Sequence, residues 1–295
     1  MRLFETIGAV AVAVVMAGGA WAATVNTISN VVFIVDESGS MGGEQAFLKD
    51  TVIDRLDADL AAAGVTNRSY GVVGYGNGQN PGNLGRAVGG ASLGDAATTK
   101  TNLGGLLTSG SFEDGYSAID FALSAYSYTP GAAINFILVT DEDRDNGNPA
   151  LDFTNILSRL SASNILLNAV VDNGFESGAG ATALGINNGG TAYVADGMGG
   201  FVEAPGGTAD PGSTKDDYVD LALQSGGAAW DLNQLRAGGN PALSFASAFV
   251  DIKVSEIISQ PPSNPNPIPV PAALPLLLGG LGALGAVRLR RKRAA

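Results

Sequence analysis

Three apolar runs, separated by helical patterns, place the strongest limits on what this chain can fold into. Each run is rich in β-branched side chains and apolar on both faces, as buried strands are: residues 31–35, 132–139 and 165–171. Segments 44–63, 113–126 and 153–161 repeat apolar residues at helical spacing. This alternation predicts an α/β fold with a doubly wound, mostly parallel central sheet, joined by right-handed crossovers and flanked by helices.

The sequence predicts one domain over residues 29–259. Weaker patterns inside it predict strands at 69–75 and 191–195 and helices at 218–224 and 241–258, with a strand at 249–257 as the alternative to the end of the last helix. The Gly- and Asn-rich segment 76–108 is expected to be mostly loop, with an edge hairpin as the alternative. Segment 174–212 is also expected to be rich in loops.

Polar side chains follow the first apolar run at the point where that strand should end. Asp36, Ser38 and Ser40 supply one carboxylate and two hydroxyls at alternate positions. In an open α/β sheet, ligands bind beyond the carboxyl ends of the strands. Carboxylates and hydroxyls are hard oxygen donors, which suit Mg²⁺ or Ca²⁺. The whole sequence contains no Cys and no His, so any metal ion must be held by oxygen.

The pattern Asp-x-Ser-x-Ser after a buried strand resembles the metal-ion-dependent adhesion site of the von Willebrand factor type A family. Val139-Thr140-Asp141 is similar to the Thr-Asp-Gly segment of that family, with Glu142 in place of its Gly. The resemblance implies that Asp141 is a further ligand, often through water. It also implies an interaction or adhesion domain that binds a partner's carboxylate through the ion.

In the family, a middle loop that leads into a helix usually contributes a Thr. Here the corresponding loop leads into the helical segment 113–126, and the spacing puts Glu113 in place of the Thr. Ser111 and Thr108 are the nearby hydroxyl alternatives. A carboxylate at this position would make the site more anionic, favouring metal binding without a partner and Ca²⁺ over Mg²⁺. Non-metal interpretations also exist, because the first loop can cap the following helix and Glu113 can favour a helix dipole.

A second pattern overlaps the site and resembles an EF-hand calcium loop: Asp141, Asp143, Asp145, Gly147 and Asp152. Its Gly stands at position seven instead of six, and Asp replaces the final Glu. The segment before it is predicted to be a strand and not a helix. These departures make the pattern the weaker interpretation.

Both ends of the chain have patterns typical of targeting signals. Residues 1–22 are typical of a signal peptide, with Arg2 before an apolar stretch and an A-x-A cleavage pattern at Ala20-Trp21-Ala22. A membrane anchor is the alternative. Near the other end, 260–269 is a Pro-rich linker and 270–287 is apolar and about long enough to be a transmembrane helix. A basic cluster that should stay cytoplasmic follows: Arg288, Arg290, Arg291, Lys292 and Arg293.

Residues 268–295 resemble the PEP-CTERM class of bacterial sorting signals. Pro269, Pro271 and Ala272 match its VPLPA variant, with Ile268 and Val270 replacing Val and Leu. The resemblance implies processing by an exosortase-type membrane enzyme in a Gram-negative bacterium. The expected location is therefore the cell envelope or surface, or the medium, after initial anchoring by the C-terminal helix. A simple tail anchor is the alternative.

Charge and composition narrow the function. Residues 23–287 hold 10 bases and 27 acids, a net charge of −17, which should repel nucleic acid. The absence of His and of a serine nucleophile elbow argues against an enzyme. The favoured function is a metal-dependent binding module for an unknown protein ligand. The alternatives are a Ca²⁺-binding structural protein of the envelope or matrix and, with less support, a metal-dependent hydrolase.

Overall fold

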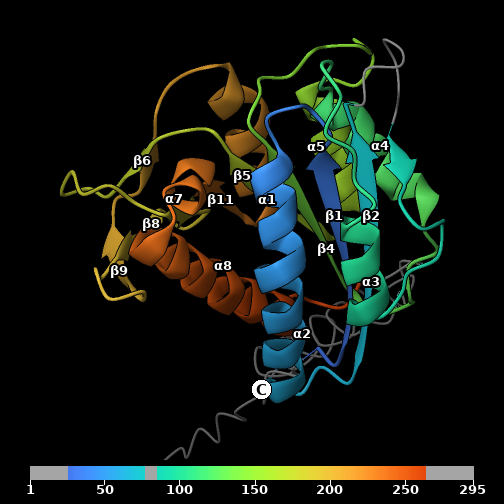
Figure 1. The fold of residues 1–295 in the computed structure, drawn as a ribbon, viewed down its shortest axis with the longest axis horizontal. Helices are drawn as coiled ribbons and strands as arrows, with labels where there is room; N and C mark the ends of the chain where they lie inside the picture. The colour runs from blue at the N-terminus through green and yellow to red at the C-terminus, as the bar shows by residue number, and fades with distance from the viewer. Residues whose placement is uncertain (1–25, 77–84, 264–295) are drawn as a thin grey trace, which may run out of the picture.

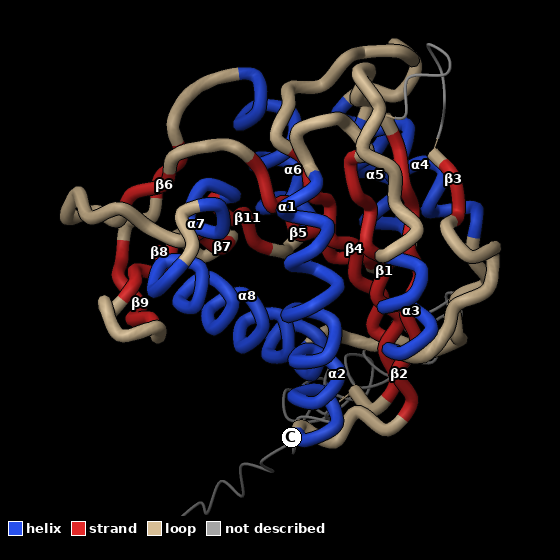
Figure 2. Tube along the Cα trace, in the orientation of Figure 1, coloured by secondary structure: helices blue, strands red, loops and turns tan. Residues whose placement is uncertain are grey.

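A mixed, mostly parallel sheet forms the centre of the molecule. The computed structural model describes residues 26–76 and 85–263. Its sheet has nine strands in the order β3-β2-β1-β4-β5-β11-β7-β8-β9 (Figures 1 and 2). The five central strands are parallel: β1 (Ile28–Asp36), β2 (Asn67–Tyr75), β4 (Ala133–Thr140), β5 (Ile165–Val171) and β11 (Ala228–Asp231).

Short antiparallel strands complete both sides of this sheet. They are β3 (Arg86–Ala87) beside β2, and β7 (Gly185–Asn187), β8 (Thr191–Ala195) and β9 (Phe201–Pro205) beyond β11. A separate ribbon pairs β6 (Phe175–Glu176) with β10 (Thr208–Ala209). The parallel centre therefore carries the fold, and the antiparallel strands extend it sideways.

Helices cover both faces of the sheet, so each face has its own core. In Figure 1, the run α1 (Gly42–Phe47), η1 (Leu48–Val52) and α2 (Ile53–Ala62) lies in front of the sheet with α8 (Gly239–Ser259). Alternate β1 residues face this layer or the opposite one, which holds α4 (Gly115–Ala125), α5 (Phe153–Ala162) and α6 (Asp220–Ser225). The remaining helices are α3 (Ala96–Leu103), η2 (Lys215–Val219) and α7 (Leu232–Arg236).

The strand order reverses its direction of growth between β1 and β4. From β1 the chain moves to β2 on one side, and it later returns to place β4 on the other side and β5 beyond it. Val35 pairs with Val139, so Asp36 and Thr140 end these two strands side by side. A reversal of this kind opens a crevice at the carboxyl ends of the strands, which is where α/β folds bind ligands.

The predicted α/β class is confirmed, and the differences lie in short or polar elements. Segment 241–258 is helical throughout in α8, so the alternative strand at 249–257 is wrong. Segment 76–108 contains α3, which the expectation of loop missed. Its N-cap Asp95 accepts a hydrogen bond from the Thr98 amide at 2.8 Å. Strand β11 was also missed, because it has only four residues.

The predicted signal peptide, the sorting motif, the transmembrane helix 270–287 and the basic cluster lie outside the described residues. Of the linker 260–269, only residues 260–263 are described. Within 26–76 and 85–263, no helix is both long enough and apolar enough to cross a membrane.

A buried polar network fastens α8 to the sheet. Lys253 is fully buried, and its Nζ donates to Asn135 Oδ1 at 3.0 Å and pairs with Glu256 Oε2 at 2.6 Å. Asn168 Nδ2 donates to the same Glu256 oxygen at 2.9 Å, and Asn135 donates to Gln260 at 2.7 Å. Burial lowers the pKa of Lys253, so its charge depends on this carboxylate.

Glu256→Gln should lower the free energy of unfolding by about 3 kcal/mol, because it leaves a buried ammonium without its counter-charge. Guanidinium titration at pH 7 measures the change. Glu176→Gln, on the exposed side of β6, is the control and should stay within about 0.5 kcal/mol of the wild type. Equal stability of the two variants would contradict a fastening role for the network.

Candidate metal centre

Asp36 joins the ends of β1 and β4. Its side chain is fully buried, Oδ1 accepts from the Ser38 amide at 2.7 Å, and Oδ2 accepts from Thr140 Oγ1 at 2.9 Å. The first bond closes a tight turn after the strand, and the second crosses the point where the sheet order reverses. The carboxylate is therefore fixed in the crevice that the topology creates.

Ser38 and Ser40 lie together on the turn that follows. Their Oγ atoms are 3.1 Å apart. Ser38 also forms a bridge with Gly110 of the middle loop, so the first loop and the middle loop run side by side. Gln45 Nε2 ties the same two segments by donating to the carbonyls of Asp36 at 3.0 Å and Leu107 at 2.8 Å.

Glu37, between the proposed ligands, has a structural role that the sequence did not reveal. Its carboxylate is fully buried, makes a two-point ion pair with Arg86, and accepts from the Leu107 amide at 2.8 Å. A Cβ on Gly74 would lie 2.5 Å from this carboxyl group, so the glycine makes the space that Glu37 fills. The pair holds β3 and the middle loop against the first loop.

Glu113 is buried and lies close to Asp36. Gly76 stands between them: a Cβ there would be 3.1 Å from Asp36 Oδ1 and 3.2 Å from Glu113 Cγ. The alternatives Thr108 and Ser111 are both exposed, although Thr108 lies beside the first loop, next to Gly42. Among the three middle-loop candidates, Glu113 is therefore the one whose side chain is buried beside Asp36.

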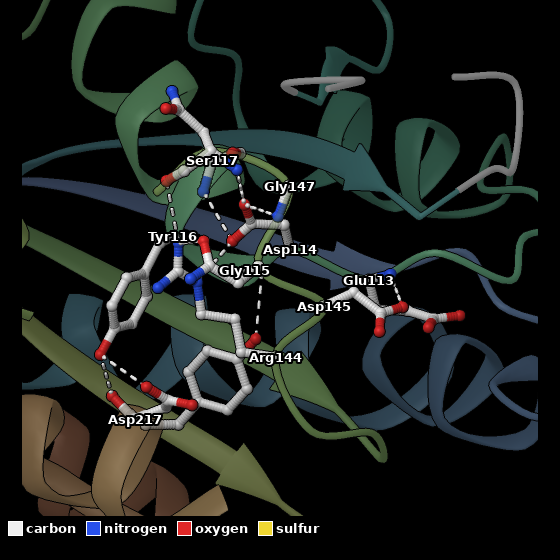
Figure 3. A network of polar contacts seen from close by, with 12 residues as sticks. Glu113, Asp114, Gly115, Tyr116, Ser117, Arg144, Asp145, Gly147 and Asp217 are labelled. Atoms are coloured by element: carbon white, nitrogen blue, oxygen red, sulfur yellow. Dashed lines mark hydrogen bonds and ion pairs between the residues drawn. The ribbon is translucent and has the colours of Figure 1, made fainter. Parts of the chain in front are cut away.

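The position of Glu113 depends on a network around the start of α4 (Figure 3). Asp114 caps that helix and pairs with Arg144 at 2.8 Å, both side chains being almost fully buried. The Arg144 guanidinium carbon lies 4.1 Å from the centre of the Tyr116 ring. Asp145 accepts from the Glu113 amide at 3.1 Å. The loop after β4 is thereby locked to the middle loop.

Asp141 follows β4 at the same edge and is held by a base. Arg236 Nη2 donates to its Oδ2 at 2.6 Å, and Arg236 Nε donates to Glu44 Oε1. Asp141 Oδ1 is buried and has no hydrogen-bond partner within residues 26–76 and 85–263. Asp141 lies near enough to Asp36 for its charge to contribute to raising the pKa of Asp36. Sequence reasoning missed both Arg236 and Glu44, since they come from distant helices.

The EF-hand pattern does not gather its side chains around one point. Asp143 accepts from the hydroxyls of Ser213 and Thr214, while Asp152 caps α5 through the Asn155 amide at 2.8 Å. Asp141 and Asp145 make the separate contacts described above. Each of these carboxylates thus makes its own local contacts, and they do not form a common site.

Burial and, to a lesser extent, neighbouring carboxylates disfavour the charged forms of the acids in this site. Burial, opposed in part by the Ser38 and Thr140 hydrogen bonds, raises the pKa of Asp36 to about 6. Burial together with the charges of Asp36, Asp145 and Glu142 raises the pKa of Glu113 to about 8. Burial also raises the pKa of Tyr75, whose hydroxyl at the end of β2 is buried without a partner. Such shifts are common where charged ligands bind.

The residues present are compatible with a hard cation. Across residues 26–76 and 85–263, no three carboxylates meet closely enough to hold a metal by themselves. A site here therefore depends on the Ser38 and Ser40 hydroxyls as well as on carboxylates. The unpartnered Asp141 Oδ1 supplies a free acceptor at the same edge. This mixed set of oxygens is chemically suited to Mg²⁺ or Ca²⁺.

Comparison with known proteins finds distant similarities to solved structures. No protein-family model and no curated protein matches the chain. Among solved structures, a von Willebrand factor type A protein from Catenulispora acidiphila is 20% identical over 49% of this chain and 33% of its own, with a TM-score of 0.35. The vWF domain of the type V pili tip protein Mfa5 from Porphyromonas gingivalis is 14% identical over 41% and 40%, with a TM-score of 0.32.

An aerotolerance-related membrane protein from Bacteroides fragilis, solved with multiple mutations to serines, is 17% identical over 77% of this chain and 99% of its own, with a TM-score of 0.41. This chain spans a third of the first of these three structures and two fifths of the second. At TM-scores below 0.5, these similarities define neither the family nor the function of the chain.

The raised pKa values predict how the ion-free protein responds to pH. A carboxyl whose pKa is higher in the folded state stabilises the fold below its unfolded value, and the effect is lost as pH rises through the folded value. In EDTA, the melting temperature should therefore fall as pH rises from about 4.5 to 8. Glu113→Gln should flatten this decline, because glutamine does not ionise. Parallel curves for wild type and variant would contradict the crowding of Glu113.

Proposed function

We propose that this chain is a von Willebrand factor type A domain that binds a divalent cation and uses it to hold a protein partner. The observation that carries the proposal is that Asp36, Ser38, Glu113 and Asp141 converge at the reversal point of the strand order. Three segments distant in sequence thereby bring buried carboxyl groups together, and a cation would stabilise their charged forms.

The proposed ligand set takes oxygens from the three segments that meet at this edge of the sheet. Asp36, Ser38 and Ser40 would hold the ion from the first loop, Glu113 from the middle loop and Asp141 from the end of β4. When bound, Mg²⁺ or Ca²⁺ supplies positive charge and open coordination for another oxygen. The chain's own part is to fix these oxygens: Thr140 orients Asp36, and Asp145 holds the Glu113 backbone.

The partner in this proposal is a protein that offers a carboxylate to the ion. Binding through the cation suits an acidic chain, since the net negative surface would otherwise repel an acidic partner. The predicted signal peptide and sorting signal put the domain outside the cytoplasm, anchored by the C-terminal helix until an exosortase-type enzyme acts. The function is then adhesion or protein interaction at the envelope, without catalysis.

One observation favours a second candidate, a Ca²⁺-binding structural protein of the envelope or matrix. Glu113 is a buried carboxylate where a neutral hydroxyl would leave the ion more electrophilic. An additional anionic ligand satisfies more of the ion's charge within the protein itself. In that case the ion would stabilise the crevice loops and would recruit no partner.

Asp36→Ala should abolish stoichiometric binding of Mg²⁺ and Ca²⁺ in calorimetric titration, because it removes the central carboxylate. Asp143→Asn is the matched control: it removes one acid of the EF-hand pattern outside the crevice and should bind like the wild type. If Asp36→Ala binds both ions as the wild type does, the assignment of the site is wrong. A loss confined to Asp143→Asn would instead favour the EF-hand interpretation.

EDTA should release a bound partner if the ion bridges the two proteins. The purified domain, immobilised, would be exposed to envelope extract with Mg²⁺ and Ca²⁺ or with EDTA. Retained proteins should be lost in EDTA and with Asp36→Ala. A retained set that is indifferent to both changes, in a domain that does bind the ion, favours the structural candidate.

A further inference from the structure

Arg236 is the base that contacts Asp141, one of the candidate metal ligands. It is the last residue of α7, with a side chain 30% exposed, whereas Asp141 and Glu44 are 7% and 5% exposed. One guanidinium thus bridges two nearly buried carboxylates, through Nη2 to Asp141 and Nε to Glu44. These carboxylates come from the end of β4 and from α1.

Each carboxylate has a second oxygen that the arginine leaves bare. Asp141 Oδ1 and Glu44 Oε2 are both buried, and neither has a hydrogen-bond partner in the part of the chain that the structure describes. Bare buried oxygens of ionised carboxyl groups are rare in folded proteins because their lost hydration is not replaced. The pair of acids therefore has unused capacity for positive charge, and one arginine does not saturate it.

We propose that Arg236 is a built-in counter-ion that occupies Asp141 when no divalent ion is bound and is displaced from it when one binds. The inference rests on the proposed metal site and identifies Arg236 as a residue that sets the affinity of that site for the ion. Glu44, which is outside the proposed ligand set, holds the guanidinium near the crevice after displacement. Arg236 therefore lowers the affinity of the site and stabilises the ion-free loops.

Electrostatics gives the direction of the effect. A divalent ion and a guanidinium on the same carboxylate repel each other, and water screens this repulsion less beside a carboxylate that is more than nine-tenths buried. Part of the ion's binding energy must consequently be spent in moving Arg236 from Asp141. Removing the positive charge removes this competition, whereas a residue that merely oriented Asp141 would weaken ion binding when lost.

The test compares Arg236→Gln with wild type by calorimetric titration of Ca²⁺ and Mg²⁺ into the full chain. Glutamine keeps an amide donor but not the charge, and the expected result is an affinity at least tenfold higher. Arg68→Gln is the control, because Arg68 is an arginine of similar exposure that pairs with Asp57 elsewhere on the molecule. It should leave the affinity unchanged. Equal or weaker binding by Arg236→Gln overturns the proposal.

Thermal melting provides a second readout, first of the ion-free protein in EDTA and then of the protein with Ca²⁺. In EDTA, Arg236→Gln should melt at a lower temperature than the wild type, because Glu44 and Asp141 lose their counter-charge. Ca²⁺ should then raise its melting temperature by more than it raises that of the wild type. An equal rise in both proteins counts against displacement.

Glu44→Gln provides a test of opposite sign and covers the case in which Arg236→Gln fails to fold. Without Glu44, the guanidinium has only Asp141 to pair with, so ion affinity should fall. Unchanged or increased affinity overturns the proposal. If neither the wild type nor Arg236→Gln binds an ion, the proposed metal site itself is wrong. If the wild type binds and Arg236→Gln gains nothing, only the counter-ion role is wrong.

Discussion

The hydrogen bond from Thr140 to Asp36 is the contact on which the crevice depends. It joins the ends of the two strands between which the sheet reverses its order of growth. Parallel strands at such a point diverge into separate connections, and nothing in the backbone ladder fixes the polar groups beyond them. One hydroxyl and one buried carboxylate supply that fixed point, and the first loop turns from it toward the middle loop.

Arginines offset the unfavourable burial of several other acids near the Thr140–Asp36 hydrogen bond. Glu37 is neutralised by Arg86 and Asp114 by Arg144. Among the residues that the structure describes, no arginine pairs with Asp36 or Glu113, and these two carboxyl groups have raised pKa values. The presence or absence of an arginine partner thus distinguishes acids with a structural role from acids that are available to a ligand.

The sequence was sufficient for those parts of the fold and site that local pattern controls. The long buried strands β1, β4 and β5 and the helices between them follow from periodicity, and the strand-end position of Asp36 follows with them. The four-residue strand β11 and the polar helix α3 lack such a pattern. Arg236 and Glu44 are 192 residues apart, and only the packing of α7 against α1 brings them together. Glu37, by contrast, lies inside the motif, yet its burial depends on the space left by Gly74.

The two outermost strands of the sheet have consequences for how copies of this chain meet. On one side, β3 is only two residues long; on the other, β9 carries an exposed Glu203 and ends at Pro205. A short strand offers little backbone for another chain to pair with, and charge and proline oppose such pairing. Both edges of the sheet therefore oppose strand pairing between molecules. Without such pairing, copies of the chain do not assemble into an open-ended fibre through their sheets.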